Sequence, residues 1–175
     1  MNKLDVYAFH YLGEIYLKEN DFDNAIKFYE KAMKISPRHI IRGVNFGKVL
    51  LEKKQADKAI KVFEKAFSKS SSPVLLKEEI AQLVFDKKIY RYAIKLFSEL
   101  LLRDSENFDY LFKNGISFKK ISDHKNAVKY LLECEKLDPE NADIKLNIAE
   151  CYMAIGQVYK ADRLLNIILK LDPEN

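Results

Sequence analysis

Apolar residues recur along the chain as pairs of helical stripes separated by short polar turns. The first stripe falls at i, i+3, i+4, i+7 and i+8, which is the spacing of one helix face: Phe9, Leu12, Gly13, Tyr16 and Leu17. A polar turn follows at residues 19–21, and a second stripe runs from Phe22 to Met33. Pro37 cannot continue that helix. Residues 6–39 are therefore predicted to form two antiparallel helices.

The whole pattern repeats with a period of 34 residues. One column holds only alanine: Ala25, Ala59, Ala93, Ala127 and Ala161. A second column holds only tiny residues: Gly13, Gly47, Ala81, Gly115 and Ala149. After a lead-in at residues 1–5, five repeats follow without insertion: 6–39, 40–73, 74–107, 108–141 and 142–175. We expect each tiny residue to meet the alanine of its own second helix, with bulky residues filling the groove around that close approach.

These columns resemble the tetratricopeptide repeat family. The matching pattern in the first repeat is Phe9-x2-Leu12-Gly13-x2-Tyr16, Ala25-x3-Tyr29, Ala32 and Pro37. The resemblance implies an all-α fold, a right-handed superhelical solenoid of five helix-turn-helix units with ten antiparallel helices. It also implies that the first helix of each repeat lines a concave groove, in which a partner protein lies as an extended or helical peptide.

The predicted groove lining consists of first-helix residues that point away from the packing face: Tyr7, His10, Tyr11, Glu14, Ile41, Val44, Asn45, Lys48, Leu75, Glu78, Glu79, Gln82, Asp109, Phe112, Lys113, Ile116, Asp143, Leu146, Asn147 and Glu150. Either Val44, Phe112, Ile116 and Leu146 anchor an apolar peptide, or they pack against neighbouring helices. Family members that hold the acidic tail of heat-shock proteins need basic and amide residues at set points of three first helices. Only Asn45 fits that set and Glu79 would repel a carboxylate, so we expect no binding of an EEVD-type tail.

The last helix is unusually apolar, and we predict a contact surface formed by Leu164, Ile167, Ile168 and Leu171. Solenoids need a terminal repeat with a polar outer face. We therefore expect that the native protein is longer than this chain or that another chain covers this surface. Two alternatives to a peptide-binding scaffold follow: a regulatory module of a larger bacterial signalling or secretion protein, or a scaffold that self-associates.

Charge is distributed unevenly along the chain, although the net charge is only +4. Residues 31–69 hold eleven Lys or Arg against three acids, whereas residues 132–175 hold five basic and nine acidic residues. We interpret the basic stretch as a solvated face rather than a nucleic-acid footprint, because no stripe of arginine and exposed aromatic residues accompanies it.

The sequence contains no arrangement typical of catalysis or of metal binding. No glycine-rich phosphate loop, H-E-x-x-H or G-x-S-x-G motif occurs, and the three histidines are far apart along the chain. Cys134 and Cys151 are expected to be buried, reduced thiols, with a redox pair or a metal site as the alternative. The prediction is a cytoplasmic, bacterial binding protein that is not an enzyme, has no cofactor and does not insert into a membrane.

Overall fold

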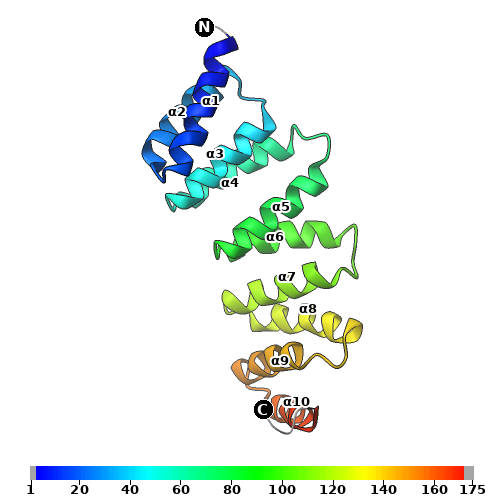
Figure 1. The fold of residues 1–175 in the computed structure, drawn as a ribbon. Helices are drawn as coiled ribbons and strands as arrows, with labels where there is room; N and C mark the ends of the chain where they lie inside the picture. The colour runs from blue at the N-terminus through cyan, green and yellow to red at the C-terminus, as the bar shows by residue number, and fades with distance from the viewer. Residues whose placement is uncertain (1–2, 172–175) are drawn as a thin grey trace. The chain divides into compact units, whose positions relative to one another are not determined.

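The computed structural model describes residues 3–171, and within them ten α-helices follow one another with no strand between them (Figure 1). The helices are α1 (Lys3–Lys18), α2 (Phe22–Ile35), α3 (Ile40–Glu52), α4 (Ala56–Phe67), α5 (Pro73–Asp86), α6 (Tyr90–Leu101), α7 (Phe108–Lys120), α8 (His124–Leu137), α9 (Ala142–Ala154) and α10 (Val158–Leu171). Each 34-residue repeat contains two of them, as predicted. The fold is an all-α helical-repeat solenoid. Helix α1 begins before the first repeat, so the predicted lead-in is partly helical.

The chain forms two compact units, Met1–Ile80 and Ala81–Asn175, and the boundary falls within α5. In the N-terminal unit α1 packs on α2, α2 on α3 and α3 on α4. In the C-terminal unit the same neighbour-to-neighbour packing runs from α6 to α10. Positions within a repeat are counted below from its first residue, so that Val6, Ile40 and Val74 occupy position 1.

The turn between the two helices of each repeat has the same backbone geometry in all five repeats. The residue at position 15 adopts a left-handed conformation, with φ between 57° and 76°: Asn20, Lys54, Lys88, Ser122 and Gly156. The following N–H donates to the carbonyl five residues earlier, as Asp21 does to Tyr16 at 2.9 Å and Gln55 to Leu50 at 2.8 Å. This is the Schellman end of a helix, in which two of its last carbonyls gain donors.

Three of the five first helices begin at a side-chain cap. Asn107 accepts from the backbone N–H of Tyr110, and Asn141 accepts from that of Ile144, both at 3.2 Å. His39 does the same for Arg42 through Nδ1 at 3.3 Å. Such caps satisfy N–H groups that have no partner inside the helix, and they set where each first helix starts.

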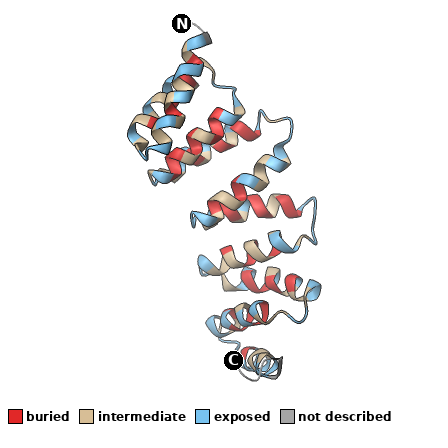
Figure 2. Ribbon diagram, viewed as in Figure 1, coloured by how far each residue is buried: buried red, intermediate tan, exposed pale blue. Residues whose placement is uncertain are grey.

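The core follows the packing faces of successive helices, drawn red in Figure 2. The five column alanines are 0–1% exposed. The bulky residue at position 24 lies nearest the glycine, and in repeat 4 the column alanine approaches it as well, since a Cβ added to Gly115 would lie 3.5 Å from the carbonyl oxygen of Ala127. A Cβ added to Gly47 would lie 2.2 Å from Cε1 of Phe63, and one added to Gly13 would lie 3.0 Å from the Tyr29 ring. The absent side chain leaves room for a ring laid across the helix.

Among the buried polar residues of residues 3–171, which also include Arg42, Ser117 and Lys145, Asn114 replaces a bulky apolar residue of the repeat. Asn114 occupies position 7, where the other repeats carry Leu12, Phe46, Ile80 and Ile148, and it is fully buried. Its Nδ2 donates to Oγ of Ser98 on α6 at 3.1 Å, while its Oδ1 has no partner within the described residues. A single neutral hydrogen bond thus replaces apolar packing between α6 and α7.

Candidate functional site

Position 2 of each repeat, near the N-terminal end of the first helix, is apolar in the N-terminal unit and acidic in repeats 4 and 5 of the C-terminal unit. Position 2 of repeats 1–3 holds Tyr7, Ile41 and Leu75, which are 55%, 64% and 67% exposed. The same position in repeats 4 and 5 holds Asp109 and Asp143, both exposed. Three large apolar side chains at one repeat position form a row on the N-terminal unit, whereas isolated exposed apolar residues are common on any protein.

Beside this row, polar side chains link each first helix to the next. Asn45 Nδ2 donates to Glu14 Oε1 at 3.2 Å, and Lys48 Nζ donates to Glu79 Oε1 at 2.8 Å. Both pairs join position 9 of one repeat to position 6 of the next, a separation of 31 residues. We call this series of contacts the polar ladder.

The polar ladder continues within the C-terminal unit. Lys113 donates to Gln82 at the same spacing, and it also donates to Asp109 at 2.6 Å. At the next junction position 9 is Ile116, which cannot take part. Lys119, one turn further along α7, donates instead to Asn147 at 2.7 Å and to Glu150.

The polar ladder changes the reading of the predicted groove residues. Nine predicted groove residues take part in these contacts and are therefore not free binding groups: Glu14, Asn45, Lys48, Glu79, Gln82, Asp109, Lys113, Asn147 and Glu150. Exposed ion pairs contribute little stability. Their consequence is local, because they bridge neighbouring first helices and order the side chains of this face. The separation of 31 residues between complementary polar side chains is visible in the sequence and could have revealed them.

The four apolar groove residues that could either anchor a peptide or pack against neighbouring helices differ in their burial. Val44 is 5% exposed and belongs to the core, so the prediction that it lines the surface is wrong. Phe112 and Ile116 are half-buried and pack against the core of the C-terminal unit. Leu146 is exposed, as is Tyr11 in the first repeat. Of these side chains, Tyr11 and Leu146 are the most accessible to a partner.

A buried cation lies at the junction of repeats 1 and 2, where none was predicted. Arg42 is almost fully buried; its Nη1 donates to the carbonyl of Ser36 at 3.4 Å, and its Nε has no partner within the described residues. Burial lowers the pKa of Arg42. The same junction brings together His10 and His39, with ring centroids 6.2 Å apart. The proximity of His10 and His39 was not predicted, because the two residues are 29 positions apart in the sequence.

His10 is a partly buried titratable group of the same face. Its Nε2 lies 3.4 Å from Glu14 Oε1, and its Nδ1 is buried without a partner in the described part of the chain. Burial lowers the pKa of His10, an effect that Glu14 opposes and that Arg42 and His39 reinforce. The ring is therefore held toward its neutral form.

The remaining predicted positions are distributed as follows. Glu78 on α5 is half-buried. On α10, Leu164 and Ile168 are half-buried and Ile167 is exposed, while the side chain of Leu171 lies outside the described residues. Leu169, which was not predicted, is the most exposed apolar side chain of α10 after Val158 and Tyr159.

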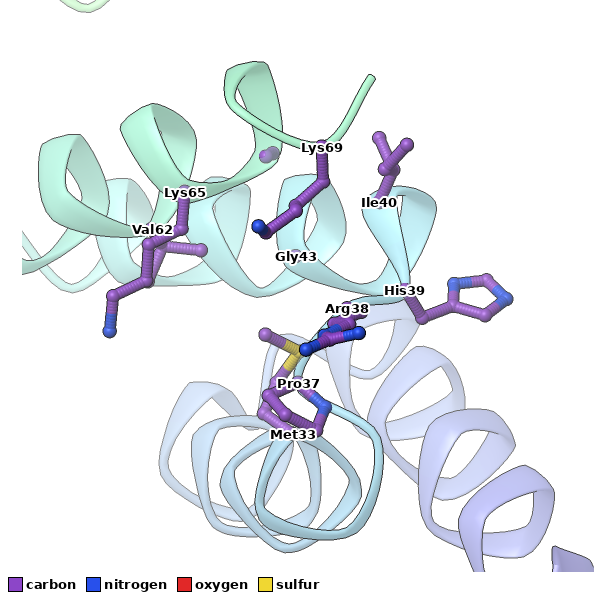
Figure 3. A pocket seen from close by; sticks show the side chains of 10 residues that line it. Met33, Pro37, Arg38, His39, Ile40, Gly43, Val62, Lys65 and Lys69 are labelled. Atoms are coloured by element: carbon purple, nitrogen blue, oxygen red, sulfur yellow. The ribbon is translucent and has the colours of Figure 1, made fainter. Parts of the chain in front are cut away.

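The described residues provide no metal-binding cluster, and the basic stretch carries one small pocket and one surface depression of about 390 Å³ along residues 54–58. No group of three or more His, Cys, Asp or Glu side chains within residues 3–171 is placed to hold a metal ion. Arg38, Lys65 and Lys69 surround a pocket between α2, α3 and α4 (Figure 3). Its volume is about 10 Å³, room for at most one water molecule. These three side chains are exposed, in agreement with a solvated face.

Cys134 and Cys151 are both buried and free. Burial raises the pKa of Cys134 to about 12, and burial also raises the pKa of Cys151. A thiol kept protonated in this way is a poor nucleophile and a poor metal ligand. The reading of both residues as reduced packing residues is therefore favoured over a redox pair.

Comparison with known proteins points to one repeat family. Family models described as "Tetratricopeptide repeat" match residues 6–39, 44–68 and 122–175. No curated protein matches the chain. None of the helices in the described range is both long and apolar enough to cross a lipid bilayer.

Several solved structures share the fold. The "Crystal structure of MamA protein" is similar with a TM-score of 0.68 and 17% identity, over 97% of this chain and 93% of that one. "MamA 41-end from Desulfovibrio magneticus RS-1" is similar with a TM-score of 0.66 and 11% identity, over 100% of this chain and 98% of that one. Identities this low establish a shared helical-repeat fold and leave function to the residues of this chain.

Proposed function

Since the chain belongs to the tetratricopeptide repeat family, whose members are protein-interaction scaffolds, we propose that its first-helix face binds a segment of a partner protein. The observation that carries the proposal is the row of Tyr7, Ile41 and Leu75, three exposed apolar side chains at one repeat position of successive first helices. Burying such side chains against a partner removes apolar surface from water, which is the main favourable term in association.

The polar ladder supports the proposal because it preorganises the face. A surface whose side chains are already ordered loses little conformational entropy when a ligand binds. Glu14 with Asn45, and Lys48 with Glu79, bridge α1, α3 and α5 beside the apolar row. The bound segment contacts the apolar row and need not break these pairs.

The spacing of the row limits the shape of the partner segment. Packed helices lie about 8–10 Å apart. A peptide extended as a polyproline II helix advances about 3.1 Å per residue with three residues per turn, so its side chains at i and i+3 lie on the same side, about 9 Å apart, and match successive first helices. The preferred ligand of the N-terminal unit is thus an extended segment with apolar residues at i and i+3.

A peptide-library selection on the full chain tests the proposal. Selected peptides are expected to carry the i, i+3 apolar pattern, and Ile41→Asp should weaken their binding at least about tenfold, the effect of losing one central anchor. Leu102→Asp is the matched control, since Leu102 is 86% exposed and belongs to the C-terminal unit, outside the first helices that carry the apolar row. Equal affinity for Ile41→Asp and the unmodified chain in fluorescence polarisation would refute the proposal.

A second candidate function is self-association through α10. Ile167 and Leu169 are exposed on this helix, and Leu164 and Ile168 are only half-buried. Light scattering across a concentration series should show a mass increase that Leu169→Lys abolishes and Asn166→Lys, at an exposed polar position of the same helix, retains. A constant monomer mass for the unmodified chain would exclude it.

We further place this scaffold in a bacterial cytoplasm. A reducing compartment is consistent with two buried thiols that form no disulfide. The AT-rich codon usage suggested by abundant lysine, isoleucine and asparagine is consistent with a bacterial source. Fractionation of the native host with an antibody to the chain tests the location.

A further inference from the structure

A stacked aromatic pair recurs inside the repeats. In repeat 1 Tyr16 stacks on Phe28, with centroids 5.4 Å apart and planes 2° from parallel. In repeat 4 Phe118 stacks on Tyr130 with the same 5.4 Å separation and an angle of 9°. Each pair joins position 11 of the first helix to position 23 of the second, twelve residues later.

Repeat 5 keeps only half of this pair. Position 11 is Tyr152, but position 23 is Leu164, so the ring that occupies position 23 in repeats 1 and 4 is missing. Repeats 2 and 3 differ again, because aliphatic residues occupy both positions. Among the five repeats only the last has a position-11 ring opposite an aliphatic side chain.

A pocket opens where the second ring is missing. It lies among α8, α9 and α10, has a volume of about 440 Å³, and is lined by Tyr152, Leu164, Ile167 and Tyr159 among others. Tyr159 is 82% exposed at its edge. The volume exceeds that of one phenyl ring severalfold, and the lining is largely apolar and aromatic, as in sites that accept an aromatic side chain.

Lys160 and Arg163 give the lining of the pocket a net positive charge. Lys160 Nζ lies 5.2 Å from the centroid of the Tyr152 ring, and Arg163 makes no ion pair within the described residues. The one acidic residue of the lining, Glu135, is already paired with Lys145 at 2.9 Å. An anionic group next to the bound ring would therefore meet Lys160 and Arg163.

We propose that this pocket is a second binding site, which accepts an aromatic side chain of a partner protein that is followed by acidic residues. The incoming ring stacks on Tyr152 in the place that Tyr130 takes on Phe118 in repeat 4. The carboxylates lie against Lys160 and Arg163. The site lies outside the first-helix face and does not depend on the function proposed for that face.

Titration of the full chain with short blocked peptides tests the site. The probes are acetyl-phenylalanyl-aspartyl-aspartate amide, its leucyl counterpart and its phenylalanyl-lysyl-lysine counterpart, followed by NMR of the tyrosine ring signals. We expect the first to bind about two- to tenfold more tightly than the leucyl probe, the range measured for aromatic pairs. The lysyl probe should bind about two- to fivefold more weakly, a difference that added salt removes.

Two variants locate the binding. Leu164→Tyr supplies the missing ring from within the chain and should abolish the preference for the phenylalanyl probe. Tyr152→Leu removes the stacking surface with the same expected loss, and the fold accommodates it because repeat 2 carries Leu50 at this position. Val158→Tyr is the matched control, since it adds the same ring to an exposed position of α10 that does not line the pocket.

Three results would overturn the proposal. Equal affinity for the phenylalanyl and leucyl probes would overturn the proposal, because stacking is then not the source of binding. Unchanged binding in Leu164→Tyr, or equal loss in Val158→Tyr, would overturn it as well, because the ring is then bound elsewhere.

Discussion

Gly47 offers a direct test of how the repeats are packed. A Cβ at this position would lie 2.2, 2.7 and 2.8 Å from three ring atoms of Phe63, which is fully buried. Carbon atoms in contact are about 3.5–4.0 Å apart, so Gly47→Ala requires the ring edge to retreat by roughly 1.3 Å. Overpacking of this kind costs about 1–3 kcal/mol.

The same helix contains the matched control. Gly43 also lies within α3, but a Cβ there meets nothing closer than 3.9 Å. Both substitutions gain the helix propensity of alanine over glycine, about 1 kcal/mol. That gain cancels in the comparison. Gly43→Ala should therefore be more stable than Gly47→Ala by the overpacking cost alone, about 1–3 kcal/mol.

Thermal and urea unfolding followed by circular dichroism measure the difference. Each kcal/mol corresponds to about 2–4 °C in Tm for a chain of this length. Adding Phe63→Leu should cost less in the Gly47→Ala background than in the unmodified chain, because the smaller side chain relieves the clash. The packing argument fails if Gly47→Ala unfolds at or above the midpoint of Gly43→Ala.

Four further predictions follow from single positions. Lys88→Gly should raise the free energy of unfolding in urea by about 0.5–1 kcal/mol, because φ is 61° there and a left-handed L-residue costs about 1–2 kcal/mol. Gly156→Ala should lower the free energy of unfolding, because φ is 76° there, although no atom lies within 4 Å of the added Cβ. Asn114→Ile should raise the free energy of unfolding by about 1 kcal/mol, since it removes an unpartnered buried oxygen; a loss would show that the bond to α6 outweighs that oxygen. Burial raises the pKa of Tyr29 from 10.0 to about 12, so the unfolded chain loses its proton first and stability should fall as pH rises from 10 to 12; Tyr29→Phe should flatten this slope in unfolding measured at several pH values. Calorimetry with a peptide ending in EEVD should show no specific heat, because the amide of Asn45 already donates to Glu14; micromolar binding that is lost in Asn45→Ala would contradict this.

Repetition in the sequence was enough to predict the fold. Five alanines at a strict spacing of 34 residues, with tiny and bulky columns at constant offsets, require the same helix pair five times. Helical periodicity and the proline after the second helix are local signals, so they do not depend on distant residues. Burial of the alanine column and the order of the ten helices follow directly.

Three features depended on contacts between helices and appeared only in the tertiary structure. Val44 was placed on the groove face by helix phase, yet it is only 5% exposed. Phe63, rather than the column alanine, fills the space left by Gly47. The pocket beside Tyr152 is lined by residues of α8, α9 and α10, so no single helix pattern reveals it. Helix phase gives the direction of a side chain from its own axis, but its exposure depends on the size and rotamer of the residues that a neighbouring helix places against it.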